Sequence, residues 1–488
     1  MKISLLPLCG FFGLCQVLPA AVTLRSLGVK GDGQTDDRVA LEAAFAKSAG
    51  QPVDGEGLTY AVRGSVHVRT GVDLRNATIR QTMTGLDTTK WIRSTGNTQT
   101  PEVKPPDALR SMVNGMPLMR HDGVATYAED RAVTGAELEA MREMLNIRTL
   151  FIYGDEAKPV PVKLEKVKIL MGEDAEAGMH SNSAAVFIRY ASPVTLKEVE
   201  VTGKGKGAGM FIHACQKVRM DGVNIHDLLW APYRGDVAFS AEVLGRDFGW
   251  NNSPIYDFDE RTGRFIRVRV QEQLTGMTLG DCEDVEILNT RVERIGTTVG
   301  GEFLPWQADA MTISGVKGLL MRDCVISQAW EGIDFTGYGV DGFVQENIHI
   351  SDTFAYGFKY AHPQKNGKVI NCTSVRADYR SFTIGAECEN IEFINCAALE
   401  TGSVGRWVRE GRDRNGICGF ELSFDNGHRP KNITLKDCRA ENMTYPKTME
   451  VGFGTSDLAG LPEHNIRLIN PKVMGATVRD VDGFKVER

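Results

Sequence analysis

The chain contains the stretch Asn-Ile-Thr-Leu-Lys-Asp-Cys at Asn432–Cys438 and repeats it in related forms. Asn-Ile-Glu-Phe-Ile-Asn-Cys occupies Asn390–Cys396, and Gly-Leu-Leu-Met-Arg-Asp-Cys occupies Gly318–Cys324. Each copy alternates apolar and polar residues and then ends in Asp or Asn and a small residue, and such alternation predicts a strand. Looser copies end at Val199, Val223, Thr290, Thr353 and Cys372. Successive copies lie roughly 20–30 residues apart, a spacing typical of a solenoid, so the sequence predicts a parallel β-helix.

A second phrase recurs between these copies and gives the register of the coils. It reads x-Gly-apolar-x-apolar, with Ala or Ser replacing Gly in some copies. Because side chains alternate along a strand, the apolar residues are expected to point inward and the middle x outward. The seven copies begin at Ala208, Thr275, Asp309, Glu331, Tyr356, Arg380 and Cys418.

The composition allows one long domain. The chain has 488 residues, 52 of them Gly, and a formal charge of −7. A solenoid grows by adding coils, so we expect a single β-helix domain over residues 21–488, with insertions at about 85–150, 228–265 and 402–414. The acidic balance argues against a nucleic-acid partner, which needs a basic face.

The first 21 residues carry one Lys, a short apolar run and, at their end, Pro19-Ala20-Ala21. This pattern predicts a secretory signal peptide and a secreted or periplasmic protein. No later segment approaches 18 consecutive apolar residues, so no membrane span is predicted after signal removal. The sequence does not predict the oligomeric state.

Four of the ten cysteines occupy one equivalent position of the repeat, at Cys324, Cys372, Cys396 and Cys438. Disulfides or a metal site are one interpretation. The interpretation we favour is a column of small buried thiols that fill space inside the helix. The chain has no Cys-x-x-Cys spacing, and no ligand spacing joins its isolated histidines, so no metal site is predicted.

A likeness to a known superfamily begins after the apolar run. Gly31-Asp32-Gly33-Gln34-Thr35-Asp36-Asp37 is followed by an Ala-rich helical pattern. This segment resembles the N-terminal cap of the pectate-lyase-like superfamily, which includes polygalacturonases and many phage tailspikes. The resemblance implies an all-β, single-stranded, right-handed parallel β-helix with a capping helix at its first coil. It identifies the fold far better than the reaction.

Ionisable residues gather where the outward positions of four consecutive coils stack. With rungs about 4.8 Å apart, they fall within a patch about 15 Å long. Trp306, Trp330, Tyr338 and Tyr360 flank the patch as candidates for stacking on sugars, and His362 and Glu421 are further candidates for substrate binding. The residues of the patch are Asp309, Glu331, Asp334, Tyr356, Lys359 and Arg380.

These residue types fit two reactions on an acidic polysaccharide. Glycoside hydrolysis needs two carboxyl groups, one of them protonated, which Asp309, Glu331 and Asp334 can supply. Elimination or C5-epimerisation of a uronic acid needs a cation for the carboxylate and a base for the proton alpha to it. Lys359, Arg380, Tyr356 and His362 can supply those, and Ca²⁺ is a possible cofactor only for a lyase. Ion pairs that merely decorate the solenoid surface are the structural alternative.

The patch resembles the catalytic motifs of the polygalacturonase family at two residues. Asp309 resembles the carboxylate of that family's Asn-Thr-Asp-Gly motif, and Glu331 resembles the second Asp of its Gly-Asp-Asp motif. Trp330 stands where the first Asp of that pair would be, and Tyr356 stands where the family has His. Because the missing Asp is the family's general acid, the inverting mechanism does not transfer directly, and Asp334 is the candidate substitute.

Further along, Arg380 lies on the coil of the family's Arg-Ile-Lys motif without reproducing it. The run Tyr356–His362 also resembles alginate epimerase and lyase sites loosely. Three hypotheses therefore follow from the sequence: a secreted glycoside hydrolase of polygalacturonase type, a polyuronate lyase or epimerase, and a polysaccharide-binding or export protein without catalysis.

Overall fold

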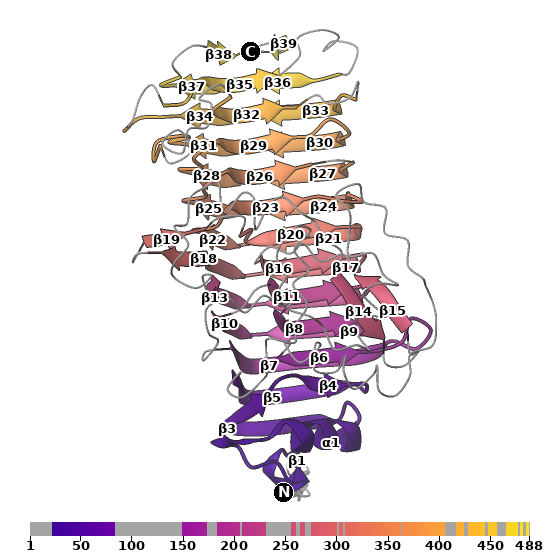
Figure 1. The fold of residues 1–488 in the computed structure, drawn as a ribbon. Coiled ribbons are helices and arrows are strands. Elements are labelled where there is room, and N and C mark those ends of the chain that lie inside the picture. The colour runs from indigo at the N-terminus through magenta and orange to yellow at the C-terminus, as the bar shows by residue number, and fades with distance from the viewer. Residues whose placement is uncertain are drawn as a thin grey trace, which may run out of the picture.

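The computed structural model is a tall stack of coils with the N-terminus at one end and the C-terminus at the other (Figure 1). It describes residues 22–82, 149–172, 183–204, 207–230, 255–259, 264–268, 275–299, 302–305, 308–361, 363–405, 416–423, 428–444, 448–455, 465–476, 479–481 and 485–487. The predicted signal peptide, the predicted insertion at 85–150 apart from its last two residues, and most of the insertion at 402–414 lie outside the described residues.

One face of the stack is a 12-stranded parallel sheet. Neighbouring strands in it belong to successive coils, as their order in Figure 1 shows. Its strands are β4 (Val66–Val68), β6 (Leu150–Tyr153), β8 (Ser183–Arg189), β11 (Gly207–His213), β16 (Thr275–Gly280), β20 (Met311–Ser314), β23 (Glu331–Phe335), β26 (Tyr356–Tyr360), β29 (Arg380–Ile384), β32 (Cys418–Leu422), β35 (Val451–Thr455) and β38 (Arg479–Val481).

The other faces form a 25-stranded sheet that holds two strands of most coils. Its strands are β1 (Val22–Thr23), β2 (Asp32–Asp36), β3 (Pro52–Arg63), β5 (Val72–Thr82), β7 (Val160–Met171), β9 (Ala191–Lys197), β10 (Glu200–Lys204), β12 (Gln216–Asp221), β13 (Asn224–Trp230), β17 (Glu283–Leu288), β18 (Arg291–Val299), β19 (Glu302–Leu304), β21 (Val316–Arg322), β22 (Val325–Ser327), β24 (Val340–Glu346), β25 (His349–Ser351), β27 (Lys365–Ile370), β28 (Thr373–Val375), β30 (Glu389–Ile394), β31 (Ala397–Leu399), β33 (Lys431–Lys436), β34 (Arg439–Glu441), β36 (Arg467–Ile469), β37 (Lys472–Met474) and β39 (Lys485–Glu487).

The repeated phrase of the sequence forms the second strand of a coil and the turn after it. The Asp or Asn before each small residue has a positive φ, for example 55° at Asp323 and 53° at Asn371. Asn is one of the few residues that adopt this left-handed conformation readily. The side-chain nitrogen of Asn347 donates to Asp323 at 3.1 Å, and that of Asn395 donates to Asn371 at 2.9 Å. From Asp323 to Asn395 the turn residues thus form a ladder along the stack with one member every 24 residues.

The interior is a continuous apolar core built from the inward positions of both phrases. Phe358, Phe382, Phe420 and Phe453 stack on successive coils with ring centroids 4.6, 4.5 and 4.9 Å apart. Gly332 shows why the second phrase favours a small residue. A Cβ there would lie 2.5 Å from the carbonyl oxygen of Gly357 on the next coil.

The cysteines are buried thiols, as predicted. All eight in the described part of the chain are free and buried. Cys324, Cys396 and Cys438 each donate to backbone carbonyl oxygens at 3.3–3.7 Å.

A capping helix, α1 (Arg38–Ser48), covers the first coil, as predicted. Leu41, Ala44 and Phe45 are its buried residues. The carboxylate of its N-cap residue Asp37 accepts instead from the backbone nitrogens of Lys30 and Gly31, each at 2.9 Å. It is the only helix of this length among the described residues, and none there is long and apolar enough to cross a membrane.

The predicted insertion at 228–265 departs from the coils and extends further than expected. β13 continues to Trp230, and β14 (Ile255–Asp259) pairs antiparallel with β15 (Arg264–Val268) in a separate hairpin. The coils resume at Thr275. β19 also pairs antiparallel, as a hairpin with β18.

Candidate active site

The register of the 12-stranded sheet aligns the outward residues into columns, as the sequence predicts. Thr312 on β20 pairs with Asp334 on β23, which pairs with Lys359 on β26. The same column continues to Thr383 on β29 and Glu421 on β32. A second column places Glu331, Tyr356 and Arg380 on successive coils.

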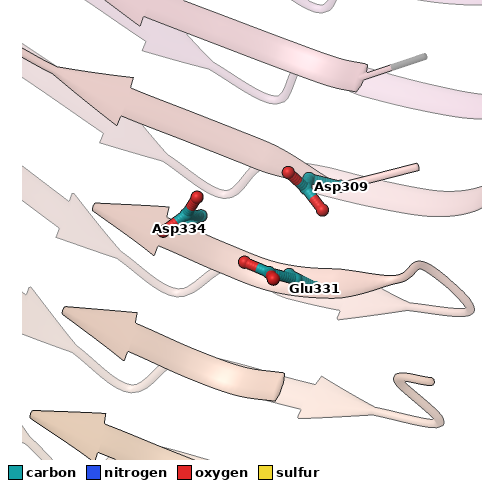
Figure 2. Close-up of side chains that lie close together, drawn as sticks. All are labelled: Asp309, Glu331 and Asp334. Carbon is teal, nitrogen blue, oxygen red and sulfur yellow. The ribbon is translucent and has the colours of Figure 1, made fainter. Parts of the chain in front are cut away.

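Three carboxyl groups meet at this face (Figure 2). Glu331 and Asp334 lie on β23, and Asp309 lies on the preceding coil just before β20. One carboxylate oxygen from each lies within 4.8 Å of the others. Each of the three residues is buried, at 3–5% exposure. The structure therefore confirms that the sequence brings these acids together, and we call them the acidic triad.

Lys359 supplies the positive charge of the site. Its Nζ lies 3.0 Å and 2.9 Å from the two carboxylate oxygens of Glu331, and 3.5 Å from Oδ2 of Asp334. It also lies 5.2 Å from the centroid of the Tyr356 ring. The Lys359 side chain is 26% exposed whereas that of Glu331 is 7% exposed, so the lysine forms the more accessible side of the cluster.

Burial and crowding of like charges raise the pKa of two triad carboxyls. Burial raises the pKa of Glu331 to about 7, although Lys359 opposes the shift. Burial, with the charges of Glu331 and Asp334, raises the pKa of Asp309 well above its usual range. Asp309 accepts a hydrogen bond from Thr312 at 3.4 Å through Oδ2, while its buried Oδ1 has no hydrogen-bond partner. Both carboxyls therefore carry protons at pH values where an ordinary carboxyl is ionised.

The two candidate bases also hold their protons. Burial lowers the pKa of Lys359, but the charges of Asp334, Glu331 and Asp309 outweigh it, and the net pKa is raised. Burial raises the pKa of Tyr356 to about 12. His362, the third candidate base, lies outside the described residues.

Arg380 lies on the next coil but its guanidinium is engaged with the protein. Nη1 pairs with the carboxylate of Glu421, Nε donates to the carbonyl oxygen of Gly416 at 3.2 Å, and Nη2 donates to the Tyr379 hydroxyl at 2.7 Å. Arg380 therefore forms its ion pair with Glu421 on the following coil. Neither Arg380 nor Glu421, a predicted substrate ligand, is free to bind a sugar in this arrangement.

Two of the predicted sugar-stacking residues are in the core. Trp330 is 3% exposed and stacks on Phe354 with ring centroids 4.5 Å apart. Tyr360 is fully buried and donates to Gln345. Stacking on a sugar is therefore wrong for both residues, because their rings point inward. Tyr338 is 63% exposed in the turn after β23 and stays a candidate, and Trp306 lies outside the described residues.

Sequence reasoning missed the part of the same outer face that lies before Phe211 in the stack. The column of Asp334 continues through Thr278 on β16 to aromatic rings at Phe211, Phe187 and Phe151. Two residues further along the strands, a second outward column holds Tyr153, Arg189 and His213. The alternation of Val186 and Ile188 inward with Phe187 and Arg189 outward is the signal that would have found this column.

Comparison with known proteins supports the fold. Residues 255–421, about a third of the chain, match a family model described as a right-handed β-helix region. The chain has the right-handed parallel β-helix fold. No curated protein matches the sequence.

Solved structures with a similar fold have very different sequences. PfbA, a surface adhesin of Streptococcus pneumoniae, is 13% identical with a TM-score of 0.45, over 96% of this chain and 91% of that one. A family 28 exopolygalacturonase of Yersinia enterocolitica is 9% identical with a TM-score of 0.45, over 96% and 78%. The A-module of the mannuronan C-5 epimerase AlgE4 of Azotobacter vinelandii is 9% identical with a TM-score of 0.42, over 94% and 97%. At these identities the likeness concerns the fold alone.

Proposed function

We propose that the chain is a glycoside hydrolase that acts on an acidic, uronate-containing polysaccharide, with Glu331 and Asp334 as its catalytic carboxyl groups. The observation that carries the proposal is the acidic triad, three buried carboxyl groups with oxygens within 4.8 Å of one another, where burial raises the pKa of Glu331 to about 7. A general acid works best when its pKa lies near the operating pH.

Glu331 is the proton donor in this scheme. It donates its proton to the oxygen of the glycosidic bond as that bond to the anomeric carbon breaks. Asp334, whose carboxylate form Lys359 stabilises from 3.5 Å, attacks the anomeric carbon. Water then replaces Asp334 at that carbon and gives its proton to Glu331, which restores both groups.

The close spacing favours retention of configuration at the anomeric carbon. Carboxyl groups lie about 5–5.5 Å apart in retaining glycosidases and about 6.5–9.5 Å apart in inverting ones. The triad oxygens lie within 4.8 Å of one another, which is nearer the retaining arrangement. Asp309 stays protonated beside Thr312 and acts as a hydrogen-bond donor at the edge of the reacting centre.

The raised pKa values of Lys359 and Tyr356 weigh against elimination or epimerisation. Both reactions need a base that is unprotonated at the working pH, and both groups hold their protons there. Arg380 is engaged with Glu421, Gly416 and Tyr379, so it is not free to neutralise a uronate carboxylate. The names of two similar solved structures, an exopolygalacturonase and an epimerase, are consistent with an acidic polysaccharide.

A panel of uronate-containing polysaccharides with mass analysis of the products tests this proposal. Hydrolysis adds one water per bond cleaved, whereas elimination gives an unsaturated uronate that absorbs ultraviolet light. The configuration of the new reducing end, read by NMR within the first turnovers, separates retention from inversion.

Variants assign the roles. We expect Glu331→Gln and Asp334→Asn each to lower kcat by about 10²–10⁴-fold. Glu283→Gln is the matched control, because Glu283 is an exposed carboxylate on the 25-stranded sheet. Full activity in both triad variants would exclude this chemistry, and binding without turnover on every glycan would favour a polysaccharide-binding protein.

A further inference from the structure

A buried arginine on the outer face of the 12-stranded sheet has donors that the protein does not use. Arg189, the last residue of β8, is 5% exposed. Its Nε and Nη1 are buried and have no hydrogen-bond partner, and only Nη2 is engaged, with the Tyr190 hydroxyl at 3.1 Å. No carboxylate in the described part of the chain forms an ion pair with it.

Such an arrangement is costly for a protein. Arginine stays charged at all accessible pH values, and buried arginines are normally paired. Removing a charge from water without a partner costs much more than burying a neutral group. The contrast with Arg380 is direct, because all three nitrogens of that half-buried arginine have protein partners.

Aromatic rings hold the Arg189 guanidinium in place. Its central carbon lies 4.7 Å from the centroid of the Tyr190 ring and 5.8 Å from that of Tyr153. The guanidinium carbon of a second arginine, Arg69, lies 5.2 Å from the centroid of the same Tyr153 ring. Arg69 and Tyr190 are half-buried, whereas Arg189 is buried. The cluster of Arg189, Arg69 and the two tyrosines is therefore most accessible at Arg69 and Tyr190.

Among the described residues, no other charged neighbour of Arg189 neutralises it. His213 follows Arg189 in the same column, and its Nε2 lies 3.1 Å from Oδ2 of Asp281. The Nδ1 of His213 is buried without a hydrogen-bond partner. The site therefore offers unused donors and positive charge, and the carboxylate of Asp281 is paired with His213.

We propose that Arg189, with Arg69 beside it, binds the carboxylate of an acidic sugar in the polysaccharide that is cleaved at the acidic triad. Arg189 is four rungs from Asp334 through β11, β16 and β20, which is about 19 Å along the stack. A glycan lying along this face reaches both sites at once, and guanidinium is the side chain best matched to a carboxylate. This inference rests on the proposed function and adds to it the group that selects an acidic substrate.

Binding to a catalytically inactive protein tests the inference apart from the reaction. The probe is a uronic-acid hexasaccharide, compared with the same hexasaccharide after reduction of its carboxyl groups, titrated calorimetrically into the Glu331→Gln chain. We expect the acidic probe to bind more tightly, and Arg189→Gln to weaken its binding about 10- to 100-fold while the reduced probe is unaffected. Arg189→Lys should restore part of the preference.

Arg219→Gln is the matched control, because Arg219 is an exposed arginine paired with Glu286 on the other sheet. A merely structural Arg189 would lower the unfolding temperature of the Arg189→Gln variant without changing the preference for the acidic probe, and that result overturns the inference. If this variant does not fold, Arg69→Gln carries the test, with a several-fold loss of preference expected and no change overturning it. Equal affinity of the starting protein for both probes also overturns it.

The two proposals fail separately. Loss of hydrolysis in Glu331→Gln with an unchanged preference in Arg189→Gln removes the arginine site and leaves the hydrolase. An Arg189-dependent preference in a chain that cleaves no glycan leaves the arginine site and removes the hydrolase.

Discussion

Lys359 on β26 places its Nζ 2.9 Å from Oε2 of Glu331 on the preceding coil. Parallel pairing of β23 and β26 fixes the two backbones, so this contact depends on register and not on a mobile loop. Burial raises the pKa of Glu331, and the ion pair with Lys359 limits that rise. The contact therefore affects both the stability of the fold and the protonation of the proposed general acid.

Replacing Lys359 by Met should move the pH dependence of activity. The ammonium lowers the pKa of Glu331, so its removal raises that pKa further above 7. Because the reaction requires protonated Glu331, the loss of activity at high pH should shift upward by about one unit or more, and kcat should fall as Asp334 loses its counter-charge. A pH–rate profile measures this. Lys317→Met, at an exposed lysine paired with Glu283, should leave the profile in place, and an unshifted profile in Lys359→Met would contradict the assignment.

Stability should fall as the pH rises through the acid and neutral range. The folded pKa of Glu331, about 7, lies above its ordinary value of 4.5. The folded state therefore binds the proton more tightly, and its stabilising effect is complete below about pH 4.5 and is lost as the pH rises to about 7. Urea unfolding at a series of pH values measures this slope. Glu331→Gln should flatten it, and identical slopes in the two proteins would show that another group is responsible.

Arg380 should prove to be a structural residue. Arg380→Met leaves Glu421 buried without its cation, and breaking a buried ion pair by removing one partner costs about 3–5 kcal/mol. The double variant Arg380→Met/Glu421→Leu should recover much of that loss, because both charges are then gone. Chemical denaturation of the two single variants and the double variant measures the recovery. A lyase would instead show an Arg380→Met defect confined to the binding of acidic substrates.

Alanine variants of Trp330 and Tyr338 should distinguish an aromatic ring that packs in the core from one that can contact a sugar. Trp330→Ala removes a buried ring stacked on Phe354 and should lower the free energy of unfolding by about 3–5 kcal/mol. Tyr338→Ala changes an exposed side chain and should alter stability by less than about 0.5 kcal/mol. If Tyr338 stacks on the substrate, its loss raises KM. Unchanged KM in Tyr338→Ala would leave the site without its exposed aromatic candidate.

The columns of the site were predictable from the sequence because the repeat has one period. The outward position of each phrase maps one to one onto the observed pairs, from Phe211 through Asp334 to Glu421. The ladder of Asp and Asn was also visible in the sequence, since the same residue type returns at the turn where the backbone needs a positive φ.

The wrong predictions of sugar stacking concern two residues whose inward direction already follows from the alternation of side chains along a strand. Tyr360 lies two residues after the inward Phe358, so the two-residue period already places its ring in the core. Trp330 precedes the outward Glu331 and points the other way. Trp330 aligns with the first Asp of the polygalacturonase Gly-Asp-Asp motif, but its side chain points into the core.

The sequence did not predict which charged side chains form ion pairs with each other. Register places Glu421 one coil from Arg380 and Glu331 two coils from it, and the side-chain geometry shows that the guanidinium pairs with Glu421. The burial of Arg189 was equally hidden, because a charged residue at the end of a strand is normally assumed to be solvated.

The eight buried thiols of the described residues are protected in the folded chain and become reactive when the chain unfolds. While the coils are intact, burial shields the sulfur atoms from oxidants in the solvent. Once the coils open in an oxidising medium, the same residues become exposed thiolates that cross-link in arbitrary combinations within and between chains. Unfolding is then irreversible, and the unfolding rate, not the free energy of unfolding, sets how long the protein stays active.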